Sequence, residues 1–468
     1  MSVVVLLADG VRPDTLAAAL DRGDLPALAR LRHEGGLHAV STVFPSVTGP
    51  AYAPFLMGRF PGPVGLPGLR WFDRERTACG FPDYTRSYVG YQMREVDRDL
   101  AADAPTIFEL APSSLAALSM ITRGLPAERR VAELSPASAV RAARTHFTGN
   151  VAGWLDIDRE VANEVVRRVG AERPAYTYAA FTGVDKVSHA RGHDHPMVVD
   201  ALRIVDDAAG RIRADAERDG AWRDMHLWIV SDHGHSPVKR HEDLAGLFKV
   251  MGHRVVAHPW VYVPFPETAV MVSGNAMAHV FLEVRRRERP WWPALAERWN
   301  GLVMRLLGRP SVDLVMLPVD GQRCEVRSRR GEIGIVSRVA GFYSYFPAIG
   351  DPLGVGRALQ GVSADDAHDA TAHTDYPDSV VQIANLAASP RSGDLILSAA
   401  RDWDFRARYE PIPHLSSHGA LHREHMTVPL LVNRPVARAP RRTTDVMPSA
   451  LAALGLPIPG SLDGASFL

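Results

Sequence analysis

The strongest constraint on the fold of this chain is the order in which apolar strand patterns alternate with helix patterns. Residues 3–7 form a short, β-branched apolar run that is typical of a buried strand. Helix patterns follow at 15–22 and 25–34, and a second strand pattern follows at 38–43. A β-α-β opening of this kind predicts a parallel sheet.

The same alternation continues along the chain. Buried-strand patterns at 175–181 and 226–230 flank a strongly periodic helix pattern at 198–219. Near the carboxyl end, an apolar strand pattern at 428–432 precedes a helix pattern at 444–454. We therefore expect an α/β fold, with a doubly wound, mostly parallel sheet that carries helices on both faces.

The pattern changes between residues 236 and 414. A strand pattern at 279–284 and a helix pattern at 291–307 are followed by short antiparallel strand patterns at 314–319, 324–328 and 331–339. This predicts a small inserted α+β module at 270–360, with the core of the fold formed by 1–269 and 361–468. We expect the module to cover one end of the sheet, where insertions of α/β enzymes carry specificity.

Composition argues against several classes of protein. The 468 residues carry 53 basic and 53 acidic side chains, so neither a nucleic acid scaffold role nor a membrane-surface role is indicated. No segment reaches the roughly 18 apolar residues of a membrane span.

Cys79 and Cys324 are the only cysteines, and the amino terminus lacks the pattern of a secretory signal. We expect a cytoplasmic protein, and the sequence does not indicate its oligomeric state.

Polar side chains that can bind metal ions follow the predicted strands. Carboxyl ends of parallel strands meet at one edge of a sheet, so these side chains should lie together. The candidate ligands are Asp9, Asp185, His189, Asp232, His233 and His418. Three carboxylates and three imidazoles suit two divalent ions, either Zn²⁺ or Mn²⁺.

The spacing of these ligands leaves their distribution between two ions open. Asp185 and His189 are four residues apart, so both can face one ion from a helical turn. Asp232 and His233 are adjacent and must diverge, so they either bridge two ions or adjoin one. Each residue alone is more typical of a helix cap or a solvated loop, and the set is what favours a metal centre. His235 is interpreted as a loop histidine, because six ligands already complete two sites.

Thr48 is the candidate nucleophile. It follows the second strand pattern in the stretch FPSVTGP and precedes Gly49 and Pro50, which predicts a helix N-cap. A helix amino terminus offers N–H groups and partial positive charge to a phosphate. A hydroxyl bound to a metal ion there can be deprotonated and attack phosphorus. The alternative is that Thr48 is only a structural cap.

Five stretches carry a resemblance to a known family: LLADGVRPDTL, VFPSVTGPAYAPFLMGRFPG, VDKVSH, SDHG and SSHG. In this order they resemble the type I phosphodiesterase and nucleotide pyrophosphatase group of the alkaline phosphatase superfamily, over roughly 1–250 and 370–468. The resemblance implies an alkaline phosphatase-like fold that hydrolyses small-molecule phosphate esters through a covalent phosphothreonine. It also implies zinc as the usual metal. The implied ligands are Asp9, Thr48, Asp232 and His233 for one ion, and Asp185, His189 and His418 for the other.

The chain departs from the family pattern after the nucleophile. Where an Asn usually donates to a phosphate oxygen, the stretch GLPGLRWFD has Leu69 with Arg70 beside it. Arg70 is therefore a candidate substrate ligand, and a guanidinium would favour a more highly charged phosphate. A phosphomonoesterase, a phosphonate hydrolase, a phosphomutase and a non-catalytic metal-binding relative stay open as alternatives.

Overall fold

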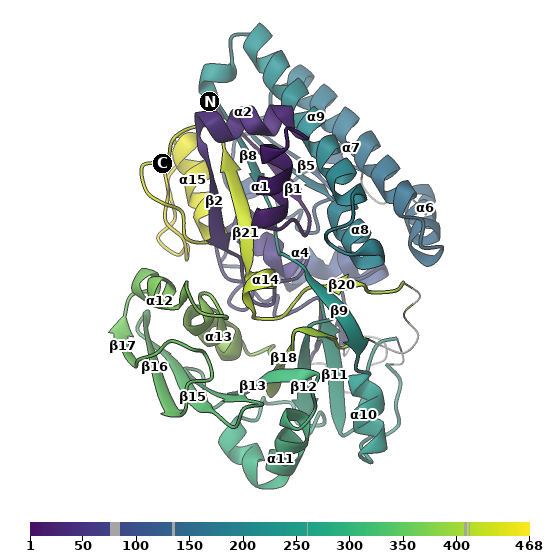
Figure 1. Cartoon of the computed structure of the whole chain (residues 1–468), viewed down its shortest axis with the longest axis vertical. Helices are drawn as coiled ribbons and strands as arrows, with labels where there is room; N and C mark the ends of the chain where they lie inside the picture. The colour runs from purple at the N-terminus through teal and green to yellow at the C-terminus, as the bar shows by residue number, and fades with distance from the viewer. Residues whose placement is uncertain (75–84, 133–135, 260, 407–409, 411) are drawn as a thin grey trace.

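The computed structural model of the chain describes all residues except 75–84, 133–135, 260, 407–409 and 411. Two large sheets account for most of its strands, and Figure 1 shows them in the upper and lower parts of the molecule. Cys324 is a buried free thiol, whereas Cys79 lies outside the described residues.

The first sheet has seven strands in the order β2-β21-β8-β1-β7-β5-β6. Their bounds are β1 Ser2–Ala8, β2 Gly36–Ser41, β5 Ser114–Ala117, β6 Arg130–Val131, β7 Tyr176–Phe181, β8 Met225–Val230 and β21 Thr427–Val432. β1 pairs in parallel with both β7 and β8, and β21 runs antiparallel to its two neighbours. The sheet is therefore mostly parallel, as predicted.

Helices cover both faces of this sheet because side chains of a strand alternate between its faces. Val4 and Leu6 of β1 pack in a core with α1 Pro13–Asp21, α2 Pro26–Glu34, α7 Val151–Glu172 and α9 Met197–Arg218. Val3 and Val5 pack in the opposite core with α3 Ala53–Met57 and α15 Val446–Ala453. The predicted doubly wound architecture is confirmed.

The second sheet has nine strands in the order β10-β11-β12-β18-β13-β14-β15-β16-β17. Their bounds are β10 Val255–Val256, β11 Thr268–Ser273, β12 Met277–Leu282, β13 Val312–Pro318, β14 Arg323–Ser328, β15 Ile333–Val339, β16 Phe342–Ile349, β17 Leu359–Val362 and β18 Leu395–Ala399. α13 Ser379–Ala388 packs on one face, and α10 Leu244–Val250 and α11 Trp292–Leu307 pack on the other.

This sheet extends beyond the range 270–360 that was predicted for an inserted module. β10 precedes that range, and β18 follows it and pairs antiparallel with both β12 and β13. The apolar run of β18 is brought between these strands by a pairing over a long sequence distance, which local periodicity does not reveal.

Shorter elements join the two sheets. β9 Ser236–His241 lies between β19 Asp402–Asp404 and β20 Ser416–Ser417, and β3 Arg70–Phe72 pairs with β4 Thr85–Ser87. Further helices are α4 Val96–Asp99, α5 Ile107–Leu110, α6 Pro136–Phe147, α8 Gly183–Arg191, α12 Ala364–Thr371 and α14 Arg423–Met426. Within the described ranges, no helix is both long and apolar enough to cross a membrane.

Candidate metal centre and active site

Three carboxylates meet at the carboxyl edge of the first sheet, as the strand order requires. Asp9 follows β1, Asp185 lies on α8 after β7, and Asp232 follows β8. The Gly10 amide donates to Oδ1 of Asp232 at 3.2 Å. Gly10 has a φ of +78°, and an added Cβ would lie 2.8 Å from the ring of His235, so only glycine fits there.

Helix α8 is held at its amino end by a buried carboxylate of α7. Asp158 accepts hydrogen bonds from the backbone N–H groups of Thr182 at 3.1 Å and Gly183 at 2.7 Å. These are amides that have no partner within the helix, so a carboxylate there also interacts favourably with the helix dipole. The bonds position the first turn of α8, which carries Asp185.

The hydroxyl of Thr48 lies beside Asp9 and His233. Its Oγ1 is 3.3 Å and 3.5 Å from the two carboxylate oxygens of Asp9 and 3.2 Å from Nε2 of His233. The predicted N-cap role of Thr48 is wrong, because a short 3₁₀ turn at Pro50–Tyr52 begins after Gly49 and α3 begins at Ala53. Contacts with the carboxylate and the imidazole, rather than a helix start, therefore place this hydroxyl.

Asp9, Asp232 and His233 form a buried group whose ligand atoms lie within 4.8 Å of one another. Nε2 of His233 is 3.2 Å from Oδ1 of Asp9 and 3.6 Å from Oδ2 of Asp232. Burial and the charge of Asp9 raise the pKa of Asp232 to about 8. Burial opposes protonation of His233, but the charges of Asp232 and Asp9 raise its pKa to about 9. Carboxylates this close need a positive charge between them, and a divalent ion fits.

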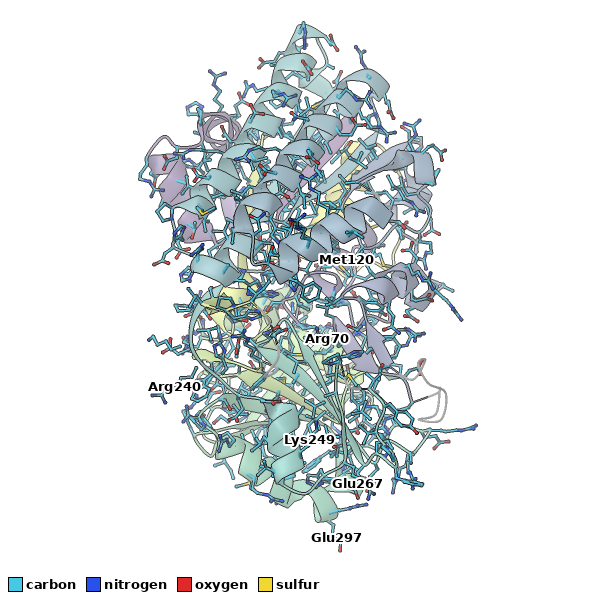
Figure 2. All side chains as sticks on the ribbon, turned by 90° about the vertical axis from the view of Figure 1, so that its right-hand side faces the viewer. Arg70, Met120, Arg240, Lys249, Glu267 and Glu297 are labelled. Carbon is cyan, nitrogen blue, oxygen red and sulfur yellow. The ribbon has the colours of Figure 1, made fainter. Side chains whose placement is uncertain are left out.

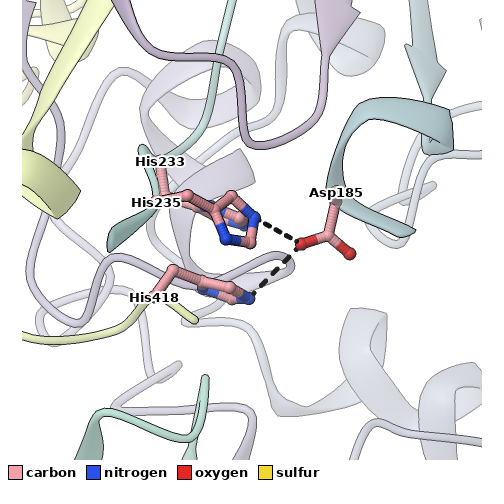
Figure 3. Close-up of side chains that lie close together, drawn as sticks. All are labelled: Asp185, His233, His235 and His418. Carbon is pink, nitrogen blue, oxygen red and sulfur yellow. Dashed lines mark hydrogen bonds and ion pairs between the residues drawn. The ribbon is translucent and has the colours of Figure 1, made fainter. Parts of the chain in front are cut away.

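A second buried group contains Asp185, His233, His235 and His418, whose ligand atoms also lie within 4.8 Å of one another. Nε2 of His235 is 3.0 Å and Nε2 of His418 is 3.6 Å from Oδ1 of Asp185, and Figure 3 shows both contacts. His189 does not belong to this group. Its Nε2 nevertheless lies 3.1 Å from the same oxygen, Oδ1 of Asp185.

The ring orientations of two histidines fit a bound cation. Nδ1 of His189 lies 2.9 Å from the carbonyl oxygen of Ser416, and Nδ1 of His418 lies 3.0 Å from that of Ser46. A carbonyl oxygen can only accept, so each Nδ1 carries a proton, and the neutral form of each ring directs a lone pair from Nε2 towards Asp185. Metal-binding histidines are commonly oriented in this way.

Lys186 occupies the other oxygen of Asp185, at 2.7 Å from Oδ2. Burial opposes ionisation of Asp185, but a protonated His189 and Lys186 hold the pKa of this carboxyl well below its ordinary value when no ion is bound. The carboxylate therefore stays charged and keeps Oδ1 directed towards the imidazoles.

Arg70 lies outside both groups. Figure 2 places it where the upper and lower parts of the molecule meet. Its Nε donates to the hydroxyl of Ser87 at 3.3 Å, and it lines a small cavity with His258, Asn275 and Glu410. Burial lowers the pKa of Arg70, and the charge of Glu410 acts in the opposite direction.

Leu69, rather than Arg70, adjoins the turn that contains Thr48. A Cβ added at Gly49 would lie 3.6 Å from Cδ1 of Leu69 and 3.1 Å from the side chain of Met120. Apolar side chains therefore border Gly49, the residue after Thr48.

His235 is the residue of the cluster that sequence reasoning missed. It lies two positions after His233, directly before β9. The spacing of His233 and His235 in SDHGH was the available signal.

Comparison with known proteins identifies the family. The model of the family "Type I phosphodiesterase / nucleotide pyrophosphatase" matches residues 3–300. The chain belongs to this family. Its members hydrolyse phosphoester bonds, and this protein is a hydrolase of that kind. No protein with a curated description matches the sequence significantly.

Several solved structures share the fold of this chain at low sequence identity. Phosphonoacetate hydrolase from Sinorhizobium meliloti, in complex with phosphonoformate, is 17% identical with a TM-score of 0.58, covering 97% of this chain and 96% of its own. Human ectonucleotide pyrophosphatase/phosphodiesterase 5 is 14% identical with a TM-score of 0.58, covering 99% and 97%. The murine protein, as an inactive threonine-to-alanine variant in complex with AMP, is 15% identical with a TM-score of 0.55, covering 98% and 96%.

Proposed function

We propose that this protein hydrolyses small phosphodiesters or nucleotide pyrophosphates by double displacement through Thr48, with a covalent phosphothreonine intermediate. The observation that carries the proposal is the place of the Thr48 hydroxyl, 3.3 Å from Oδ1 of Asp9 and 3.2 Å from Nε2 of His233. Thr48 is half-buried whereas Asp9 and His233 are fully buried, so a substrate can reach the hydroxyl from solvent.

Two divalent ions are part of the proposal. One is assigned to Asp9, Thr48, Asp232 and His233, and the other to Asp185, His189 and His418. Bound ions would lower the pKa of the Thr48 hydroxyl and offset the charge that develops on the attacking and leaving oxygens. Zn²⁺ is the proposed metal with Mn²⁺ as the alternative, because both accept imidazole and carboxylate ligands.

The residues of the chain then have defined tasks. Oγ1 of Thr48 donates its proton towards Oδ1 of Asp9, which directs a lone pair at the substrate. Attack forms the bond between Oγ1 and phosphorus and releases the leaving group with its electron pair. Water then attacks the same phosphorus and breaks that bond, which returns the electron pair and a proton to Oγ1, restores the threonine and releases a phosphate monoester. Two of the assigned imidazoles, His233 and His418, and the three carboxylates are buried, so water reaches the site from the side of Thr48.

The structural relatives support this assignment without deciding the substrate. An inactive variant of the murine protein has a threonine replaced by alanine and binds AMP, which agrees with a threonine nucleophile and a nucleotide ligand in that protein. The bacterial relative is a phosphonoacetate hydrolase, so cleavage of a carbon–phosphorus bond is the second candidate activity. We also propose Arg70 as a contact of the substrate phosphate. The cytoplasmic location of the protein stays a prediction.

A substrate panel with controlled metal content tests the proposal. The purified protein is freed of metal with a chelator and assayed with a chromogenic phosphodiester, a chromogenic monoester, a nucleotide pyrophosphate and phosphonoacetate. We expect diester or pyrophosphate hydrolysis that is lost with chelator and restored by Zn²⁺ or Mn²⁺. Release of product at equal rates with and without chelator would contradict the metal dependence.

The same panel separates the alternatives. Cleavage of phosphonoacetate alone would identify a phosphonate hydrolase, and preference for the monoester would identify a phosphomonoesterase. Transfer of phosphate to an added alcohol, without net release, would identify a phosphomutase or phosphotransferase. Ion binding without turnover of any substrate would indicate a non-catalytic relative.

A further inference from the structure

His235 is a buried histidine for which the proposed function has no task. It directly precedes β9, the central strand of the three-stranded sheet β19-β9-β20. Its Nε2 lies 3.0 Å from Oδ1 of Asp185. A histidine in this position either donates a hydrogen bond to the carboxylate or directs a lone pair at an ion beside it.

The hydroxyl of Ser416 decides between these two possibilities. Its Oγ lies 2.9 Å from the carbonyl oxygen of Ser236 and 3.2 Å from Nδ1 of His235. A carbonyl only accepts, so the single hydroxyl proton of Ser416 is directed to Ser236. Oγ must then accept from His235, which places the imidazole proton on Nδ1.

The consequence is that Nε2 of neutral His235 carries a lone pair and faces a carboxylate oxygen. Nε2 of His189 and of His418 face the same oxygen, at 3.1 Å and 3.6 Å, with their Nδ1 atoms held by backbone carbonyls. When the three imidazoles are neutral, their lone pairs are all directed at one carboxylate oxygen and repel it unless a cation lies among them. Lys186 does not serve, because its ammonium contacts the other oxygen, Oδ2, at 2.7 Å.

We propose that His235 is a direct ligand of the metal ion on Asp185, with Ser416 as the residue that sets its tautomer. His235, His418 and Asp185 belong to one group of ligand atoms within 4.8 Å. This adds a third imidazole to the set proposed above. The ion then has up to four protein ligands, so that a substrate oxygen would enter as a fifth.

The proposal rests on the metal dependence in the proposed function, and its test measures ions rather than turnover. Metal per chain is determined by elemental analysis after equilibration with Zn²⁺ buffered over a range of free concentrations. His235→Gln is the decisive variant, since a glutamine amide can donate to Asp185 but is a poor ligand for Zn²⁺. We expect the affinity for one of the two ions to fall by more than about 100-fold in His235→Gln. This loss exceeds the usual effect of removing a residue that only hydrogen-bonds to a metal ligand.

Ser416→Ala tests the tautomer argument separately. It removes the hydroxyl that accepts from His235 and keeps the backbone carbonyl that accepts from His189. We expect a loss of metal affinity of roughly 10- to 100-fold. Ser417→Ala is the matched control, because the single hydroxyl proton of Ser417 is donated to the Gly274 carbonyl, at 3.2 Å. The metal affinity of this variant should equal that of the wild type.

The outcomes separate the two proposals. If the wild type binds two ions and His235→Gln keeps both with unchanged affinity, His235 is only a hydrogen-bond donor and this inference is overturned. If the wild type binds no ions, the metal dependence of the proposed function fails instead. Circular dichroism of the metal-free proteins checks that each variant is folded.

Discussion

At the scale of single residues, Thr48 combines a reachable hydroxyl with partners that are shielded from water. Asp9 and His233 are fully buried, so their electrostatic effect on Oγ1 is stronger than it would be at the surface. Leu69 and Met120 border the neighbouring Gly49 with apolar atoms. The environment of Thr48 is therefore polar on the side of the sheet and apolar beside the turn.

The first prediction concerns the nucleophile. Thr48→Ala should lower kcat/KM by on the order of 10³-fold or more, because it removes the attacking oxygen. Metal content and thermal stability should change little, since the variant loses at most one metal contact. Thr48→Ser, which keeps a hydroxyl, is the control and should retain measurable turnover. Thr48→Ala with more than a tenth of wild-type activity would exclude Thr48 as the nucleophile.

The second prediction concerns Arg70. If its guanidinium reaches the phosphate, Arg70→Ala should reduce turnover of a dianionic monoester roughly 5- to 150-fold more than that of a monoanionic diester. Steady-state rates with both chromogenic esters measure this ratio, and Arg70→Lys should keep part of it. An equal effect on both esters would leave Arg70 as a residue of the cavity it shares with His258 and Glu410.

At the scale of elements, the buried His279 of β12 forms hydrogen bonds with two neighbouring segments. His279 donates from Nε2 to the carbonyl of Pro67 at 2.8 Å and accepts at Nδ1 from the amide of Gly393 at 3.1 Å. Both ring nitrogens are satisfied only in the neutral form. Burial, assisted by the charge of Arg289, accordingly lowers the pKa of His279 to about 4, although the bond to Pro67 opposes this.

The third prediction follows from that pKa. Between pH 6.5 and about 4 the unfolded chain binds a proton at His279 that the folded chain does not, so stability is lost as the pH falls through this window. At pH 5 the loss is about 2 kcal/mol. His279→Gln cannot titrate, so urea midpoints at pH 7.5 and pH 5 should differ less in this variant than in the wild type.

An exposed histidine provides the control for this measurement. His33→Gln on α2 should show the same difference between the two pH values as the wild type. An unchanged difference in His279→Gln would show that acid destabilisation arises at other groups.

At the scale of the whole molecule, the second sheet reaches the metal centre through the turn between β11 and β12. Asn275 forms a backbone bridge with His418, and the amide of Ala276 donates to the His418 carbonyl at 3.0 Å. Gly274 packs against the same loop with a φ of +62°. The lower part of the molecule in Figure 1 thus helps to place His418, a proposed metal ligand of the upper part.

The fourth prediction tests this coupling. A Cβ at Gly274 would lie 3.1 Å from the His418 carbonyl, the Gly419 Cα and the Val47 Cβ, so Gly274→Ala should displace His418 and weaken ion binding. Gly331→Ala is the matched control, because its φ is +83° and nothing lies within 4 Å of an added Cβ. It should cost roughly 1–2 kcal/mol of stability without changing metal affinity.

Equal metal affinities in the two glycine variants would contradict the coupling. Equilibrium metal titrations together with thermal melts separate backbone strain, which both variants share, from displacement of His418.

Local patterns in the sequence were sufficient to predict the first sheet and the carboxylates at its edge. Residues 3–7, 175–181 and 226–230 are apolar runs, and the observed strands β1, β7 and β8 differ from them by at most one residue at each end. Parallel neighbours end at the same edge, so Asp9 and Asp232 had to lie close together once those strands paired.

The tertiary structure decided what depends on contacts between distant segments. β18 joined the second sheet through pairing with β12 and β13, and Thr48 came to lie beside Asp9 in a turn rather than at a helix start. Nδ1 of His235 came to lie 3.2 Å from the hydroxyl of Ser416, 181 residues away along the chain. Periodicity reports which side chains share a face of one element, whereas the atoms facing a side chain belong to whichever segments pack against it.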